Sequence, residues 1–213
     1  MVRVAISVEG QTEDEFCKQI LAPYFQQKNI ELTPIIVTTK REKCGVKHKG
    51  GCINLDRVKN EVNKLLSSFD YVTTFYDLYG FDGVDNITAN ELEEKMAQFF
   101  NNRKFIPYIQ KYEFETLLFS EPSYYEELFS NPQAQLDMEK IINSFSGNIE
   151  DINNSKETAP SKRMIEFFDK YDEDFDKIFY GYSIIEEIGL EKVLEKAPRF
   201  RAWVEKIEAL SKK

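Results

Sequence analysis

The chain has 213 residues, a mass of 25.0 kDa, a formal net charge of −9 at pH 7 and a pI near 4.9. This acidity argues against a protein that coats nucleic acid regardless of sequence, because such proteins carry a basic surface. An enzyme that reaches phosphate through a metal ion remains open, since its acidic ligands contribute negative charge. No apolar run approaches the roughly 18 to 20 residues that span a bilayer, and the N-terminus lacks the pattern of a secretory signal. We therefore expect a cytoplasmic protein with no membrane partner.

The first 120 residues alternate between strand and helix patterns. Residues 2–8 form a short apolar run typical of a buried parallel strand, and further strands are predicted over 32–39, 70–77 and 105–110. Thr12 is a good helix N-cap, and Glu15 three residues later completes a capping-box pattern. A second helix is predicted to start near Asn54, after a basic, glycine-containing loop over 40–51. This alternation predicts an α/β fold with a mostly parallel sheet and flanking helices over residues 1–120.

The rest of the chain, residues 121–213, is predicted to be a helical C-terminal extension packed on that core. Helical patterns cover 122–145 and 160–211, with a polar loop between them. Helical spacing predicts a set of buried side chains in the second stretch: Ile184, Ile185, Ile188, Leu190, Val193 and Trp203.

Acidic residues stand where three predicted strands end. Glu9 follows the first strand, Asp77 ends the third, and Glu113 and Glu115 follow the fourth. Ligands of open α/β sheets bind beyond the carboxyl ends of the strands, so these acids should meet at one edge, with strands 2–8 and 70–77 adjacent. Clustered carboxylates repel one another unless a cation lies between them, and hard divalent ions take oxygen ligands. The pattern therefore predicts an Mg²⁺ or Mn²⁺ site, to which at most one of Glu113 and Glu115 binds directly.

The alternative interpretation is that these acids only cap helices. Glu13, Asp14 and Glu15 are typical of first-turn acids facing a helix dipole, and for Glu9 alone the two interpretations weigh about equally. The agreement of three separate strand ends favours the metal site.

Several motifs resemble those of a known family. In order along the chain, they are VEGQTEDEF, the Lys49-Gly50-Gly51 turn, VTTFYDLYGF, YIQKYEFETLLFS, APSKR and IGLEKVLEKAPRF. Together they resemble a Toprim-related bacterial family of unknown function, whose genes often stand beside a predicted ATPase gene in defence-like loci. The Toprim domain is the metal-binding α/β domain of topoisomerases, primases and the OLD-family nucleases. The resemblance spans nearly the whole chain.

The resemblance implies roles for particular residues. Glu9 matches the strand-end glutamate of Toprim domains, a metal ligand or general acid/base, and Glu13 in the same motif is included among the metal ligands. Asp77 matches the first acid of the Asp-x-Asp motif, but Leu78 and Tyr79 follow it, so the second acid is absent. Glu113 or Glu115 is then left to complete the site.

Two basic stretches could contact phosphate. The loop from Lys40 to Lys49 contains five basic residues and the only histidine, His48, although a solvated loop is an equally good interpretation. Lys162 stands at a predicted helix start, where it could stabilise phosphate charge.

Other cofactors find little support in the sequence. Cys44, His48 and Cys52 stand at four-residue intervals, but structural zinc needs four ligands and only Cys17 remains, so plain structural positions are favoured over zinc. No GxxxxGK[ST] or GxGxxG motif indicates a nucleotide cofactor. The aromatic residues around Tyr108 to Tyr125 are interpreted as core packing rather than as a base-stacking platform.

Two functional hypotheses follow. The leading one is an Mg²⁺- or Mn²⁺-dependent nuclease that hydrolyses phosphodiester bonds in DNA or RNA, with Glu9, Asp77, Glu113 and Lys162 as catalytic residues, in a defence or DNA-repair system with an ATPase partner. The competing one is a non-catalytic partner subunit of an ATPase, with a degenerate acidic site. The missing second acid of Asp-x-Asp favours this second hypothesis.

Overall fold

A computed structural model describes residues 1–37, 54–81, 87–153 and 155–212. The chain divides into two compact units, one of Met1–Gln110 with Glu208–Lys213 and one of Lys111–Ile207. Each unit is described by itself below.

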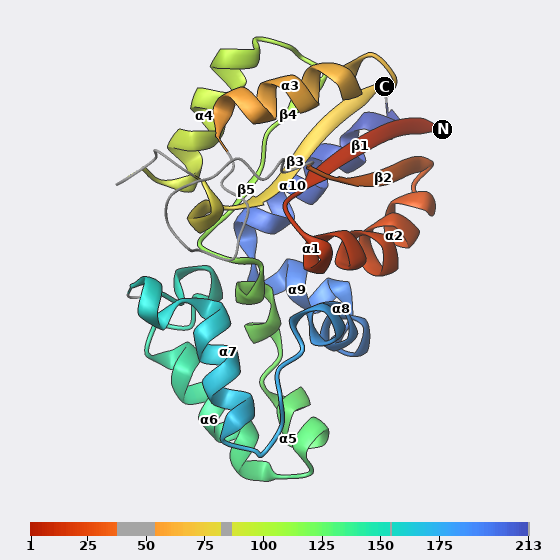
Figure 1. The fold of residues 1–213 in the computed structure, drawn as a ribbon. Helices are drawn as coiled ribbons and strands as arrows, with labels where there is room; N and C mark the ends of the chain where they lie inside the picture. The colour runs from red at the N-terminus through yellow and green to blue at the C-terminus, as the bar shows by residue number, and fades with distance from the viewer. Residues whose placement is uncertain (38–53, 82–86, 154, 213) are drawn as a thin grey trace. The chain divides into compact units, whose positions relative to one another are not determined.

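The first unit is built on a parallel β-sheet (Figure 1). Its strands are β1 (Val2–Val8), β2 (Ile30–Ile36), β3 (Tyr71–Asp77), β4 (Phe105–Ile106) and β5 (Ile109–Gln110). The strand order is β2-β1-β3-β4, with β5 also paired to β3, and every pairing is parallel. The predicted parallel sheet is confirmed, and so is the adjacency of the strands at 2–8 and 70–77.

The predicted strand over 105–110 is broken in the middle. Pro107, which has no N–H to donate, separates β4 from β5. Threonine hydroxyls of β3 bond to the backbone on either side of the break: Thr73 Oγ1 donates to Ile106 O, and Thr74 Oγ1 contacts both O and N of Tyr108 at 2.9 Å. Side chains of β3 thus supply the hydrogen bonds that a continuous ladder would have made.

Helices cover both faces of this sheet (Figure 1). Helices α3 (Leu55–Leu66) and α4 (Ala89–Phe100) bury Val62 and Leu92 in one cluster with the β-strand residues Ala5 and Tyr76. On the other face, Phe16 at the end of α1 (Gln11–Phe16) contacts the ring of Phe75. A π-helical turn over Cys17–Leu21 connects α1 to α2 (Ala22–Gln26).

The first helix starts earlier than the sequence pattern predicted. Gly10 is the N-cap and has no side chain to cap the helix, but Glu13 rather than Glu15 makes the reciprocal contact of a capping box by accepting a hydrogen bond from the Gly10 N–H at 2.9 Å. The prediction of Thr12 as N-cap is therefore wrong. Gly10 has the extended backbone of an N-cap and the Glu13 carboxylate binds its N–H, so the helix begins directly after it. The prediction of a helix start at Asn54 is confirmed, since its side chain accepts from Arg57 N.

The second unit is helical. It begins with the 3-10 segment η3 (Phe114–Ser120) and continues with α5 (Ser123–Phe129), α6 (Pro132–Asn143), α7 (Pro160–Asp169), α8 (Lys177–Ile188), α9 (Leu190–Lys196) and α10 (Pro198–Glu208). All seven residues of η3 are buried. Five of the six side chains predicted to be buried are so, and Ile188 is half-buried.

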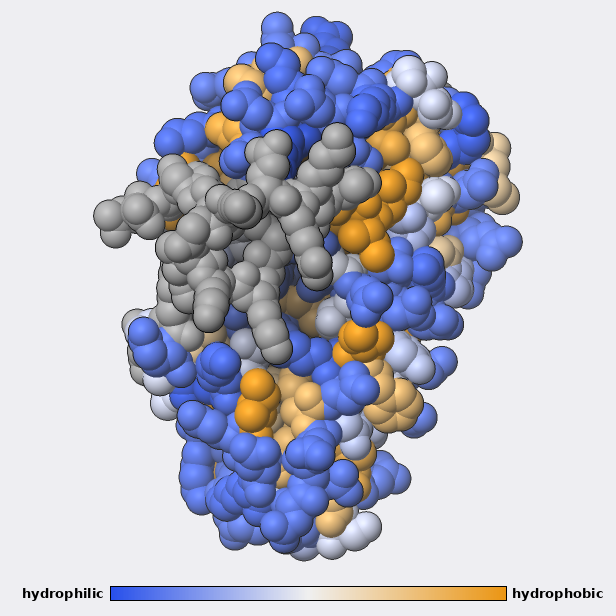
Figure 2. Space-filling model, in the orientation of Figure 1, coloured by the Kyte–Doolittle hydropathy of each residue, from blue (hydrophilic) through white to orange (hydrophobic). Residues whose placement is uncertain are grey.

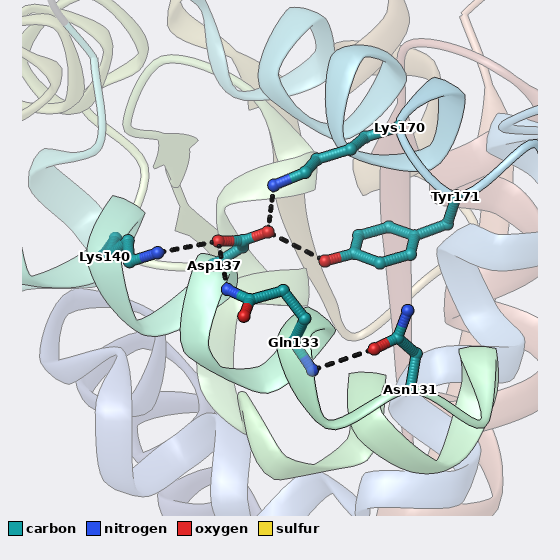
Figure 3. Close-up of polar contacts among 6 residues, drawn as sticks. All are labelled: Asn131, Gln133, Asp137, Lys140, Lys170 and Tyr171. Carbon is teal, nitrogen blue, oxygen red and sulfur yellow. Dashed lines mark hydrogen bonds and ion pairs between the residues drawn. The ribbon is translucent and has the colours of Figure 1, made fainter.

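A polar cluster holds α6 against the end of α7 (Figure 3). The Asp137 carboxylate accepts hydrogen bonds from Gln133 and Lys140, at 2.9 Å each, from the Tyr171 hydroxyl at 2.8 Å and from Lys170. These contacts, those of Lys170 first, hold the pKa of Asp137 well below its usual range. Burial and the adjacent Asp137 raise the pKa of Tyr171 to about 12.

Most of the surface seen in Figure 2 is hydrophilic, with hydrophobic side chains in small separate patches. The large hydrophobic side chains most exposed among the described residues are spread along the chain, and only the last two are adjacent, on α8: Met1, Ile36, Phe99, Leu136, Ile178 and Phe179. None of the helices in the described ranges has the length and apolar character needed to cross a membrane.

Candidate metal centre

Glu9 leaves the carboxyl end of β1 and lies against a glycine of another element. That glycine is Gly80, in the 3-10 turn Leu78–Gly80 that follows β3. A Cβ atom built on Gly80 would lie 2.2 Å from Glu9 Oε2 and 2.6 Å from Oε1, closer than real Cβ contacts ever come. The Glu9 carboxylate is therefore packed on the bare Cα of Gly80, and the ends of β1 and β3 come together there.

Asp77 ends β3 beside this contact. Val8 and Phe75 form the last pair of the β1–β3 register, and Glu9 and Asp77 follow these paired residues by one and two positions. Neighbouring strands lie about 4.8 Å apart, which places the backbones that carry the two acids within one residue step of each other across the sheet. This register brings the ends of the two strands together, and that the Glu9 and Asp77 carboxylates meet there stays a prediction.

A buried pair of hydroxyl groups lies under the Glu9 end of the sheet. The Tyr76 hydroxyl donates to Ser7 Oγ at 2.6 Å, and both residues are fully buried. Burial raises the pKa of Tyr76, and the negative charges of Glu61 and Glu9 raise it further. The phenol therefore stays protonated and acts as a donor close to the negative charge at the strand end.

Glu13 and Asp14, which follow in the same motif, have local partners. Glu13 accepts from the Gly10 N–H, and Asp14 pairs with Lys18 one helical turn later. Both residues are buried, at 8% exposure. The Glu13 contact is the helix-capping role that the alternative interpretation gave to first-turn acids.

Glu113 and Glu115 belong to the second unit. Glu113 Oε2 accepts from the Ser161 N–H at 2.8 Å, at the first turn of α7, where the N-cap residue Ala159 has no side chain able to do so. Glu115 is 4% exposed and pairs with Lys177 of α8 at 2.8 Å. Burial raises the pKa of Glu115; the Lys177 charge opposes this and the Glu113 charge adds to it. That Glu113 or Glu115 joins the ligands at the sheet edge stays a prediction.

Lys162 lies in the first turn of α7 and is exposed. The backbone N–H just before it, that of Ser161, is bound by Glu113, so one of the anion-binding groups at this helix start is already used. A phosphate contact by the Lys162 side chain stays a prediction.

Some predicted positions lie outside the described residues. These are the basic loop with His48, the two cysteines considered for zinc, Cys44 and Cys52, and the Lys49-Gly50-Gly51 turn. Cys17, by contrast, is a buried free thiol in the π-helical turn. Burial, together with the charges of Glu13 and Asp14, raises its pKa, so this thiol is poorly suited to act as a thiolate ligand.

The donor set at the sheet edge can be compared with what a hard divalent ion requires. Mg²⁺ is commonly bound through one or two carboxylates, with water and substrate phosphate completing the shell. Glu9 and Asp77 supply two carboxylates, and Glu9 Oε2 and Asp77 Oδ1 are shielded from solvent. Within residues 1–37, 54–81, 87–153 and 155–212, no group of three or more His, Cys, Asp or Glu side chains is arranged to hold a metal. Two carboxylates are the number that Mg²⁺ commonly takes from a protein, and that Glu9 and Asp77 bind one ion together stays a prediction.

Two residues of these sites were not predicted from the sequence. Gly80 lies in the segment DLYGF, in which no sequence pattern predicts that a carboxylate following β1 packs on it. Lys177 is 62 positions from Glu115, and nothing in the chain between them indicates the pairing.

The fold places the chain among α/β proteins that resemble the C-terminal region of OLD proteins. The structure matches the C-terminal region of the Burkholderia pseudomallei OLD protein with a TM-score of 0.50 at 12% identity, covering 99% of each chain. It also matches the corresponding region of the Xanthomonas campestris pv. campestris OLD protein, with a TM-score of 0.46 at 12% identity over 98% of this chain and 95% of the other. The chain belongs to the family described as "Domain of unknown function (DUF4276)", whose profile matches residues 8–208. Among curated proteins no sequence matches it.

Proposed function

We propose that this protein is a nuclease of the Toprim type, which uses Mg²⁺ or Mn²⁺ to hydrolyse phosphodiester bonds in DNA or RNA. The observation that carries the proposal is the Glu9 carboxylate at the carboxyl end of β1, packed on Gly80 and one register step from Asp77. An OLD-like fold and the VEGQTED motif support the same reading.

Each candidate residue would have a defined role. Glu9 and Asp77 would hold the ion, and Glu9 could also take the proton of an attacking water. A bound divalent ion supplies a water of lowered pKa and neutralises charge on the scissile phosphate. The roles expected for Glu113 as a further ligand and for the exposed Lys162 as a phosphate contact stay predictions from the sequence. The resemblance to families encoded beside an ATPase gene adds a partner ATPase in a defence or DNA-repair system to this proposal.

The test is a cleavage assay on supercoiled plasmid, linear duplex, single-stranded DNA and RNA, with Mg²⁺, Mn²⁺ or EDTA, and with and without an adjacently encoded ATPase. Wild type should cut at least one substrate only with metal. Glu9→Gln and Asp77→Asn should lose activity about 100-fold or more. Glu31→Gln is the matched control, because Glu31 is an exposed glutamate on β2 of the same sheet. Cleavage in EDTA, or full activity in Glu9→Gln, would contradict the proposal.

A second candidate function is a non-catalytic partner subunit of an ATPase. Two observations favour it: Asp77 is followed by Leu78 and Tyr79 instead of a second acid, and Glu113 and Glu115 make structural contacts with Ser161 and Lys177. Thermal melts separate the two candidates, since an ion that binds only the folded state stabilises it. If millimolar Mg²⁺ or Mn²⁺ leaves the wild-type melting temperature unchanged and Glu9→Gln melts lower, the carboxylate is structural and the partner subunit is favoured.

A further inference from the structure

Gly80 differs from other glycines of the chain in the reason for which a glycine is needed. Gly147 and Gly189 have φ angles of 77° and 82°, which favour glycine, and a Cβ on either would meet nothing within 4 Å. Gly80 has no such left-handed φ, yet its Cβ would overlap three atoms of the Glu9 carboxylate. The backbone at position 80 would accept alanine, but the Glu9 carboxylate, which is the far end of a flexible side chain, would have to move.

We infer that Gly80 is a positioning residue that sets where the Glu9 carboxylate stands at the sheet edge. This inference rests on the proposed metal-dependent function for its consequence, because it assigns the position of the first ligand. A methyl group at position 80 would push Glu9 Oε2 away by roughly 1 Å to restore normal contact. Displacements of this size, and loss of groups that orient metal ligands, reduce activity about 100-fold and metal affinity about 10- to 100-fold.

The turn that carries Gly80 also begins at Asp77. Asp77 is the N-terminal cap of the 3-10 turn Leu78–Gly80, and the turn closes with a hydrogen bond from Phe81 N to Leu78 O at 3.3 Å. One short turn therefore has Asp77, the second proposed ligand, at its start and Gly80, against which the first ligand Glu9 packs, at its end. The turn thus links the two proposed ligands.

A double-mutant cycle read out by Mn²⁺ binding tests the inference. Mn²⁺ affinity is measured by electron paramagnetic resonance of the free ion for wild type, Gly80→Ala, Glu9→Asp, Glu9→Ala and the two double variants. Gly80→Ala should bind Mn²⁺ about 10- to 100-fold more weakly than wild type. The aspartate in Glu9→Asp carries its carboxylate on a side chain one methylene shorter. The double variant Glu9→Asp/Gly80→Ala should therefore bind Mn²⁺ more tightly than Gly80→Ala alone. In the Glu9→Ala background, Gly80→Ala should change affinity less than 2-fold, because no carboxylate is left to displace.

Other results would overturn the inference: a Gly80→Ala affinity equal to wild type, an equal loss in the Glu9→Ala background, or no Mn²⁺ binding by wild type. If Gly80→Ala fails to fold, Glu9→Ala/Gly80→Ala should fold, since the overlap is gone; failure of both would count against the inference. The nuclease assay is scored separately. A wild type that cuts no nucleic acid, but whose Mn²⁺ affinities follow this pattern, would refute the nuclease proposal and leave Gly80 as the positioning residue.

Discussion

Replacing Asp137 by asparagine should destabilise the second unit by about 2–3 kcal/mol at neutral pH. The asparagine has one acceptor oxygen in place of two and turns its amide N–H groups towards donors. The Lys140 and Lys170 side chains are 71% and 55% exposed, so water takes over their charge and each contact contributes roughly 0.5 kcal/mol. The Tyr171 and Gln133 hydrogen bonds contribute about 1 kcal/mol each, with more where a donor is left buried.

The same carboxylate gives the prediction a pH signature. The folded-state pKa of Asp137 is lowered, first by Lys170, so its stabilising contribution is fully present above the unfolded pKa of about 3.9 and is lost as pH falls towards the folded value. The stability difference between wild type and Asp137→Asn should therefore be constant between about pH 5 and 8 and shrink below about pH 4.

Urea denaturation followed by tryptophan fluorescence is the assay. Trp203 is the only tryptophan and is buried in the second unit, so its emission reports that unit. With a typical slope of about 1–3 kcal/mol per molar urea, Asp137→Asn should shift the midpoint by roughly 1 M or more. Asp169→Asn, the same change at an exposed position of α7, is the control and should shift it little. Equal midpoints for the two variants, or a difference that grows as pH falls, would refute the reasoning.

Three further predictions use the same measurements. Lys177→Met should destabilise the second unit by about 1–3 kcal/mol, because it leaves the buried Glu115 carboxylate without its counter-charge while water already screens the half-exposed lysine, and adding Glu115→Gln should recover most of the loss in urea midpoint. Glu150→Gln should cost about 1–2 kcal/mol by the same fluorescence assay, because the buried Glu150 accepts from two N–H groups at the start of α10. Glu9→Gln should raise the melting temperature of the metal-free protein, by relieving repulsion from Asp77, and should abolish any rise produced by Mg²⁺ or Mn²⁺.

The elements that the sequence predicted well are those fixed by local pattern. The apolar run at 2–8 and the acid at each strand end were enough to predict β1, β3 and their adjacency. The errors arose where another residue type overrode the pattern. The apolar pattern over 105–110 predicts one continuous strand, but Pro107 separates it into two. The first helix has Gly10 as its N-cap, two residues before the more common cap residue Thr12.

Contacts between distant residues had no local signal. Gly80 lies against Glu9 and Lys177 pairs with Glu115, yet each comes from an element far along the chain from its partner. The tertiary fold decides whether a strand-end acid packs on another element, caps a helix or pairs with a lysine. A sequence pattern could therefore indicate the group of acids but not the contact that each one makes.

The first residues of two helices explain why some of the acids have a structural role. Helices α7 and α10 both begin with an Ala-Pro pair, Ala159-Pro160 and Ala197-Pro198. The proline has no N–H, and the alanine side chain has no acceptor for the backbone N–H groups that follow. In each case a glutamate from elsewhere in the chain takes over that role: Glu113 accepts from Ser161 N, and Glu150 from Arg199 N.

A carboxylate bound to helix N–H groups in this way contributes to stability whether or not a metal is ever bound. Glu13 acts likewise within its own helix, by accepting from Gly10 N. Glu9 differs, because its carboxylate packs on Gly80 in the turn after the neighbouring strand β3. Helix capping does not require such a contact. Among the predicted ligands, Glu9 and its neighbour Asp77 are therefore the pair on which a test of metal chemistry should concentrate, with Glu113→Gln expected to act first on the stability of the second unit.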